Sequence, residues 1–153
     1  MDKTSLSLLE ELTEAHGLPG HEQAVRAIVE KRVKGLAEVS YDRLGSVLCE
    51  RKGAAAQPRI MLPGHMDEIG FIVNAVTDDG YLKFSPLGGW WDQVLLAQRV
   101  IVKSRQGDLA GIIGSKPPHM LEDEERKKVV KRKDMFIDIG AEDKKEATGK
   151  LGV

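Results

Sequence analysis

The sequence predicts an α/β segment followed by a compact β-rich module. The first observation is a change of hydrophobic period: apolar residues repeat at helical spacing up to about residue 36 and at a spacing of two afterwards. The second is that crossover helices, which a parallel α/β sheet needs between its strands, stop after the third or fourth predicted strand. The third is a series of short strands and hairpin turns that begins after Gly70.

Two helices are predicted at the start of the chain. The first places apolar residues on one face and ends at the Gly-Leu-Pro-Gly turn at 17–20. The second begins near Glu22 and continues to about Leu36, with charged residues on its solvent side.

Three short strands are predicted next. Residues 39–41 and 47–49 alternate and are joined by a turn, in which we expect Asp42 to accept backbone hydrogen bonds. Residues 60–62 are entirely apolar, which is typical of a strand buried on both faces of an α/β sheet.

The remainder is predicted to be almost purely β, with two helical pieces. Short apolar runs are separated by turns containing glycine and aspartate. The predicted strands are 71–76, 81–84, 99–103, 109–113 and 135–139, and the predicted helical pieces are 122–130 and 142–150.

Composition limits the classes of function. The chain has 153 residues, which suits one domain or one and a half, and a formal net charge of −1. This charge gives no electrostatic case for nucleic acid or an anionic membrane as a partner. The first residues lack the basic and apolar regions of a signal peptide, and the longest apolar runs are too short to span a bilayer. We therefore expect a soluble cytoplasmic protein.

A histidine two residues before an aspartate follows the apolar run at 60–62. His65 could bind a cation through one ring nitrogen while Asp67 orients the ring through the other. From spacing alone, His65 could instead be a turn histidine satisfied by a hydrogen bond, and Asp67 a turn acceptor. Glu68 is interpreted as support for this loop or as a contact with a neighbouring subunit.

A second candidate is His119, which follows two prolines in a rigid loop. Loops carry function disproportionately. Three roles stay open for this side chain: lining a substrate pocket, contacting another subunit, or completing a structured loop.

Six blocks of the sequence resemble the M42 family of metallo-aminopeptidases. This family includes the TET peptidases and glutamyl aminopeptidase, and some of its members carry the older label endoglucanase M. The sequence His-Met-Asp-Glu-Ile-Gly-Phe that begins at His65 is the most specific of the blocks. The blocks lie at 17–26, 42–46, 64–73, 87–90, 111–119 and 136–141.

The resemblance implies a two-domain subunit. One domain would be an α/β/α zinc-peptidase domain, and the other a β-rich, PDZ-like or barrel dimerisation domain inserted into it. Residues 1–68 would be the N-terminal part of the catalytic domain, and residues 69–153 most of the dimerisation domain. We expect the chain to be the N-terminal portion of such an enzyme.

The resemblance also assigns site residues. His65 would be the first ligand of a site for two divalent ions, zinc or cobalt, and Asp67 the catalytic carboxylate that orients it. The remaining metal ligands and the general base are expected outside this chain. Short peptides would be the substrates, and the β domain would assemble the subunits into a homo-oligomer, up to a dodecamer.

The resulting prediction is a metal-dependent aminopeptidase, a hydrolase, whose present portion is inactive alone. An alternative is a non-enzymatic assembly module that pairs through the β domain. A weaker alternative, suggested by the older label, is a glycoside hydrolase. That chemistry needs two facing carboxylates at a set separation, and no such pair stands out in the sequence.

Overall fold

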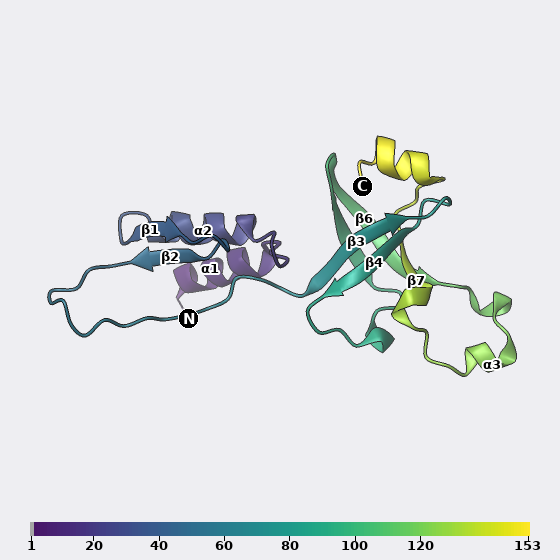
Figure 1. Cartoon of the computed structure of the whole chain (residues 1–153), viewed down its shortest axis with the longest axis horizontal. Coiled ribbons are helices and arrows are strands. Elements are labelled where there is room, and N and C mark those ends of the chain that lie inside the picture. The colour runs from purple at the N-terminus through teal and green to yellow at the C-terminus, as the bar shows by residue number, and fades with distance from the viewer. Residues whose placement is uncertain (1) are drawn as a thin grey trace. The chain divides into compact units, whose positions relative to one another are not determined.

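The computed structural model describes residues 2–153, apart from the side chain of Lys150. Contacts divide the chain into two compact units, Met1–Ile69 (unit 1) and Gly70–Val153 (unit 2). Unit 1 holds two helices and a two-stranded sheet, and unit 2 holds a five-stranded sheet (Figure 1). The mixed α/β class is therefore confirmed.

The two predicted helices of unit 1 are present as α1 (Lys3–Glu14) and α2 (Gln23–Val33). The side chain of Asp2 caps α1, since it accepts a hydrogen bond of 2.8 Å from a backbone N–H of the first turn. Arg32 of α2 forms an ion pair with Glu11 of α1, with 2.5 Å between nitrogen and oxygen. This pair ties the two helices together.

The two strands that follow, β1 (Glu38–Tyr41) and β2 (Val47–Glu50), pair in antiparallel register. Asp42 begins the connecting turn. Its Oδ1 accepts hydrogen bonds of 2.8 Å from the N–H groups of Leu44 and Ser46. The predicted role of Asp42 is therefore confirmed.

The prediction of a buried strand at 60–62 is wrong. Residues 51–69 form no helix or strand, and the side chains at 60–62 are exposed: Ile60 by 80%, Met61 by 82% and Leu62 by 91%. A strand takes its hydrogen bonds and its buried faces from neighbouring strands. No strand within the described residues pairs with this segment, so its apolar composition alone does not make it β.

Unit 2 is built on an antiparallel sheet with the order β3-β4-β7-β6-β5. Figure 1 shows the sheet twisted and curled. All five predicted strands are present, some with longer bounds. They are β3 (Gly70–Val76), β4 (Leu82–Leu87), β5 (Arg99–Ser104), β6 (Gly107–Ser115) and β7 (Met135–Asp138).

The helical pieces of unit 2 are shorter than predicted. Only α3 (Asp123–Arg126) forms within 122–130, and the last helical turn is a π-helix, η4 (Glu146–Lys150). A capping box between Glu122 and Glu125 begins α3, but none of its residues is buried. A short helix without a packed face gains little beyond its capped first turn. Three 3-10 turns complete the unit: η1 (Asp92–Val94), η2 (Pro118–Met120) and η3 (Arg132–Asp134).

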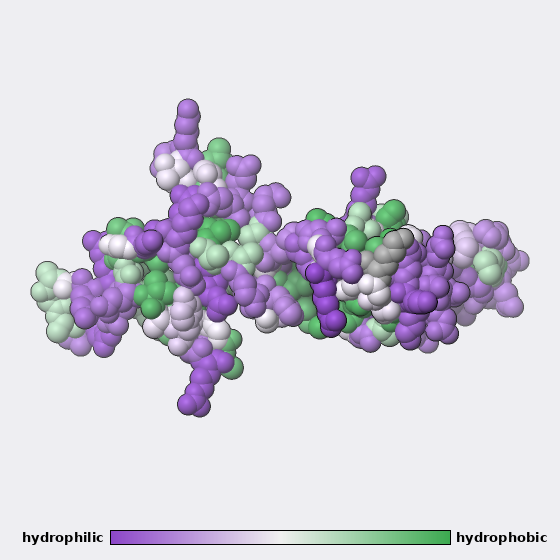
Figure 2. All heavy atoms as spheres, turned by 90° about the horizontal axis from the view of Figure 1, so that it is seen from above, coloured by the Kyte–Doolittle hydropathy of each residue, from purple (hydrophilic) through white to green (hydrophobic). Residues whose placement is uncertain are grey.

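The hydrophobic core belongs to unit 2. Its buried cluster draws on β4, β5, β6, β7 and the turn after η1, and consists of Leu82, Phe84, Leu95, Val102, Ile113, Met135 and Ile137. Within the described part of unit 1, Val25 is the one buried hydrophobic side chain. On the face drawn in Figure 2, hydrophilic residues dominate and hydrophobic residues are exposed in scattered patches. None of the described helices has the length and apolar character needed to cross a bilayer.

Candidate metal-binding turn

His65 and Asp67 contact each other in the turn that follows the extended segment. The Nδ1 atom of His65 lies 3.0 Å from the carbonyl oxygen of Asp67 and 3.2 Å from its carboxylate Oδ1. Because both partners are acceptors, Nδ1 carries the hydrogen when the ring is neutral, and the lone pair is then on Nε2. The His65 side chain is 84% exposed. The ring therefore suits one ligand position for a zinc or cobalt ion, with Asp67 as the residue that orients it.

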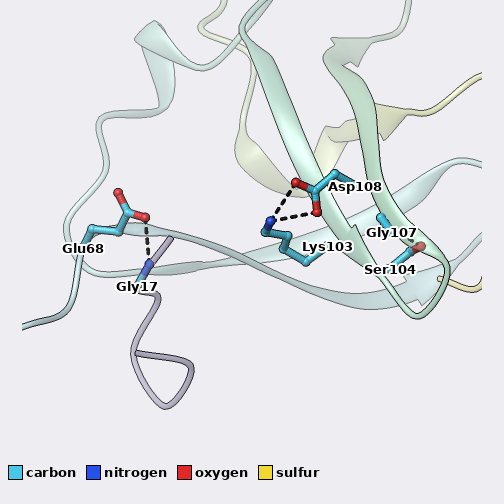
Figure 3. Close-up of polar contacts among 6 residues, drawn as sticks. All are labelled: Gly17, Glu68, Lys103, Ser104, Gly107 and Asp108. Carbon is cyan, nitrogen blue, oxygen red and sulfur yellow. Dashed lines mark hydrogen bonds and ion pairs between the residues drawn. The ribbon is translucent and has the colours of Figure 1, made fainter. Parts of the chain in front are cut away.

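The turn is attached to the helices of unit 1 through Glu68. Its backbone N–H donates to the carbonyl oxygen of Gly17 at 2.7 Å. Its carboxylate Oε1 accepts from the Gly17 N–H at 3.0 Å (Figure 3). Gly17 lies in the connection between α1 and α2 and is buried. The interpretation of Glu68 as support for this loop is confirmed.

One imidazole is not a complete metal site. In the part of the chain that the structure describes, no three His, Cys, Asp or Glu side chains are grouped so that they could hold an ion. The pair of His65 and Asp67 can therefore supply one ligand and its orienting carboxylate. The location of the remaining ligands and of the general base stays a prediction.

His119 lies in unit 2, on the 3-10 turn η2, and is exposed. Pro117 and Pro118 precede it, as the rigid-loop interpretation requires. Its three proposed roles stay open.

Gly17 is the residue of this region whose role the sequence did not reveal. The Gly-Leu-Pro-Gly pattern indicates the end of a helix, and the chain does turn there. Its contact with Glu68, however, joins residues 51 positions apart. No local pattern predicts a contact of that range.

The fold of this chain is that of solved TET aminopeptidases. A TET aminopeptidase from the marine sediment archaeon Thaumarchaeota archaeon SCGC AB-539-E09 superposes with a TM-score of 0.94 and 50% identity, over 99% of this chain and 42% of that one. A Pyrococcus horikoshii TET1 peptidase, described as able to assemble into a tetrahedron or a large octahedral shell, gives a TM-score of 0.81 and 36% identity over 93% and 42%.

Similarity in sequence identifies the family to which the chain belongs. The sequence model of M42 glutamyl aminopeptidase matches residues 45–153, and a second model, described as AMPT, matches residues 3–28. The lysyl aminopeptidase of Pyrococcus furiosus is 34% identical over 143 residues, which are 92% of this chain and 41% of that protein. The chain belongs to the M42 glutamyl aminopeptidase family. It spans about 40% of the length of the relatives that it matches.

The glycoside hydrolase alternative is not supported. The matching family is one of aminopeptidases, and relatives from Pyrococcus furiosus and Lactococcus lactis are named lysyl and glutamyl aminopeptidase. The older endoglucanase label therefore gives no guide to the chemistry of this chain.

Proposed function

We propose that this chain contributes the first metal ligand and the assembly module of a metal-dependent aminopeptidase, which removes N-terminal residues from short peptides. The observation that carries the proposal is the contact between Nδ1 of His65 and Asp67, which leaves Nε2 directed away from Asp67. Family membership and the names of the relatives support the same activity.

In this proposal His65 binds an ion through Nε2, and Asp67 holds the ring through Nδ1. When bound, two divalent cations, zinc or cobalt, would activate a water molecule and polarise the scissile carbonyl. Asp67 fixes the orientation of the ring and raises the basicity of the ligand. Such carboxylate support typically changes metal affinity or activity by about 10- to 100-fold.

Unit 2 is proposed to be the PDZ-like dimerisation domain. Its sheet has two edge strands, β3 and β5, and its core is formed from its own residues. Edge strands present unpaired backbone groups to which another chain can bind. The Pyrococcus horikoshii relative is described as able to assemble into a tetrahedron or a large octahedral shell, and we propose that this chain likewise assembles with copies of itself.

A chimeric enzyme tests the proposal. Residues 1–153 would replace the matching segment of the TET aminopeptidase that is 50% identical, and hydrolysis of aminoacyl chromogenic substrates would be measured with zinc or cobalt. We expect an active chimera, loss of activity in His65→Ala, and a decrease of about 10- to 100-fold in Asp67→Asn. His21→Ala, at an exposed histidine between α1 and α2, is the matched histidine control. Full activity of the His65→Ala chimera would refute the proposed ligand.

The 153-residue chain alone is expected to be inactive, because one histidine and one aspartate cannot retain two cations. An assembly module without its own activity is the second candidate, favoured by the self-contained core of unit 2. Size-exclusion chromatography with light scattering distinguishes this candidate, since a strict monomer at high concentration contradicts self-assembly. Hydrolysis by the isolated chain that His65→Ala abolishes would overturn the expectation of inactivity.

A further inference from the structure

Glu68 satisfies both polar backbone groups of one distant glycine. The Gly17 carbonyl accepts from the Glu68 N–H at 2.7 Å, and the Gly17 N–H donates to the Glu68 carboxylate at 3.0 Å. Figure 3 shows this carboxylate directed at the Gly17 nitrogen. Through its carboxylate and its backbone N–H, Glu68 thus joins two segments that are 51 residues apart. We call this pair of bonds the Gly17–Glu68 clamp.

The clamp is also closely packed. A Cβ atom at Gly17 would lie 2.8 Å from Cγ2 of Val25 and 3.0 Å from the carbonyl oxygen of Met66. Val25 is the buried hydrophobic residue of α2, and Met66 lies between His65 and Asp67. The backbone of the turn at 65–68 therefore approaches the α1–α2 connection so closely that a side chain at Gly17 would force Val25 or the turn to move.

The clamp attaches the turn at 65–68, which the segment before it does not hold in place. The described residues 51–64, which lead into His65, form no helix or strand. The His65 side chain is 84% exposed, so packing does not hold its ring. The backbone of the turn can be fixed from its other end, where Glu68 follows Asp67 directly.

We propose that Glu68 is a positioning residue, which clamps the turn at Gly17 and so holds His65 against Asp67 in the Nδ1–H tautomer. The significance of that tautomer for metal binding rests on the proposed function, because the tautomer leaves the Nε2 lone pair for the ion. The clamp itself and its effect on the ring do not depend on any metal.

Nitrogen NMR of the neutral imidazoles tests the proposal in the 153-residue chain. In the unmodified chain we expect His65 to favour the Nδ1–H tautomer. Glu68→Ala removes the hydrogen bond between the carboxylate and the Gly17 N–H. We then expect the ratio of the Nδ1–H to the Nε2–H tautomer of His65 to fall about fivefold, the factor that one typical hydrogen bond represents. Glu68→Gln keeps an oxygen acceptor for the Gly17 N–H and should restore most of the ratio. The ratio is compared under conditions in which the variant is folded, because an unfolded chain also loses the contact between His65 and Asp67.

Glu22→Ala is the matched control. The Glu22 carboxylate accepts from the Gly20 N–H at 2.7 Å, which is also a carboxylate–glycine bond at the α1–α2 connection. It has no hydrogen bond to residues 65–68 among those described. We expect the His65 tautomer ratio to stay unchanged in this variant. The proposal is overturned if Glu68→Ala leaves the ratio unchanged, or if Glu22→Ala lowers it equally.

Hydrogen exchange in the unmodified chain provides a test that needs no variant. The clamp predicts that the Gly17 amide exchanges about tenfold or more slowly than the Gly20 amide, whose bond is local and exposed. Equal exchange rates would show that the clamp does not persist in solution and would overturn the proposal even if Glu68→Ala failed to fold.

The two proposals can fail independently. If the His65→Ala chimera keeps its peptidase activity, His65 is not a metal ligand, and the tautomer and exchange measurements still decide whether Glu68 positions the ring. If the chimera behaves as expected but Glu68→Ala leaves the tautomer ratio unchanged, His65 is supported as a metal ligand. The proposal that Glu68 positions the ring is then refuted.

Discussion

Carboxylates in this chain commonly accept hydrogen bonds from backbone N–H groups. Asp2 caps α1, Asp42 closes the β1–β2 turn, and Glu68 accepts from Gly17. The first two act within a few residues, and aspartate at a helix start or a turn is a familiar local pattern. For that reason the role of Asp42 could be predicted from sequence, whereas the partner of Glu68 could not.

Asp42 makes the β1–β2 turn sensitive to pH. Hydrogen bonds from Ser46, through its side chain and its backbone N–H, lower the pKa of Asp42 below its ordinary value of 3.8. A lowered pKa in the folded state means that the contribution to stability is present above 3.8 and is lost as the pH falls through the folded value. We expect the Leu44 and Ser46 amide resonances to shift with a midpoint below pH 3.8. A midpoint at or above 3.8 in an NMR titration would contradict this assignment.

At the scale of elements, the strands of the two local hairpins were predictable from the sequence, and so was β7, although its partners β4 and β6 lie farther away in the chain. The β3–β4 and β5–β6 hairpins follow from alternating residues around short turns. The apolar run at 60–62 has the composition of a strand but has no pairing strand in the described chain. The α3 helix is shorter than its charge pattern suggests, because charge pattern alone does not provide a buried face.

Gly111 is a position where β6 packs tightly against its neighbours. A Cβ atom there would lie 2.7 Å from Cγ2 of Ile137 on β7 and 3.3 Å from Cγ2 of Val100 on β5. Both neighbours belong to the sheet, so a methyl group would displace packed side chains. We expect Gly111→Ala to lower the free energy of unfolding of unit 2 by about 1–3 kcal/mol in denaturant melts.

Gly89→Ala is the control for this prediction. Gly89 is exposed, and an added Cβ would meet nothing within 4 Å. We expect its effect to stay within about 0.5 kcal/mol. Equal stabilities of the two variants would show that the space around Gly111 can expand at no cost.

Asp92 connects η1 to η3 across unit 2. Its carboxylate accepts from the Arg132 Nε at 2.8 Å and from the Arg132 backbone N–H at 3.2 Å, and both side chains are less than a third exposed. Asp92→Ala leaves these donors without their acceptor. We expect a loss of about 1–3 kcal/mol in the free energy of unfolding, measured by urea denaturation.

Asp108→Ala removes an ion pair of a different kind. Asp108 contacts Lys103 across the β5–β6 hairpin at 2.7 Å (Figure 3), but both side chains are about half exposed. Solvent screens such a pair, and we expect a loss below about 1 kcal/mol. An effect as large as that of Asp92→Ala would mean that exposure does not govern these two pairs.

At the scale of the whole molecule, the two units differ in how much apolar surface they bury. Unit 2 has a cluster of seven buried hydrophobic residues, whereas Val25 is the buried hydrophobic residue among those described in unit 1. Composition could not predict this difference, because both halves contain apolar residues at regular spacing. Burial depends on which segments meet, and in unit 1 the apolar run at 60–62 meets none of the described strands.

This difference predicts two levels of local stability in one chain. Buried apolar area is the main source of stability, and amide exchange reports it segment by segment. We expect the slowest-exchanging amides to lie in β4, β6 and β7, and residues 51–64 to exchange almost as fast as an unfolded chain.

Proteolysis under native conditions should likewise cut first within 51–64, where the backbone forms no helix or strand. Slow exchange there, or protection of α1 and α2 equal to that of β6, would contradict this expectation and would mean that unit 1 is protected either by contacts with other copies or within one chain. Repeating the measurement across a dilution series separates these causes, because protection due to self-association weakens on dilution, whereas protection within one chain does not.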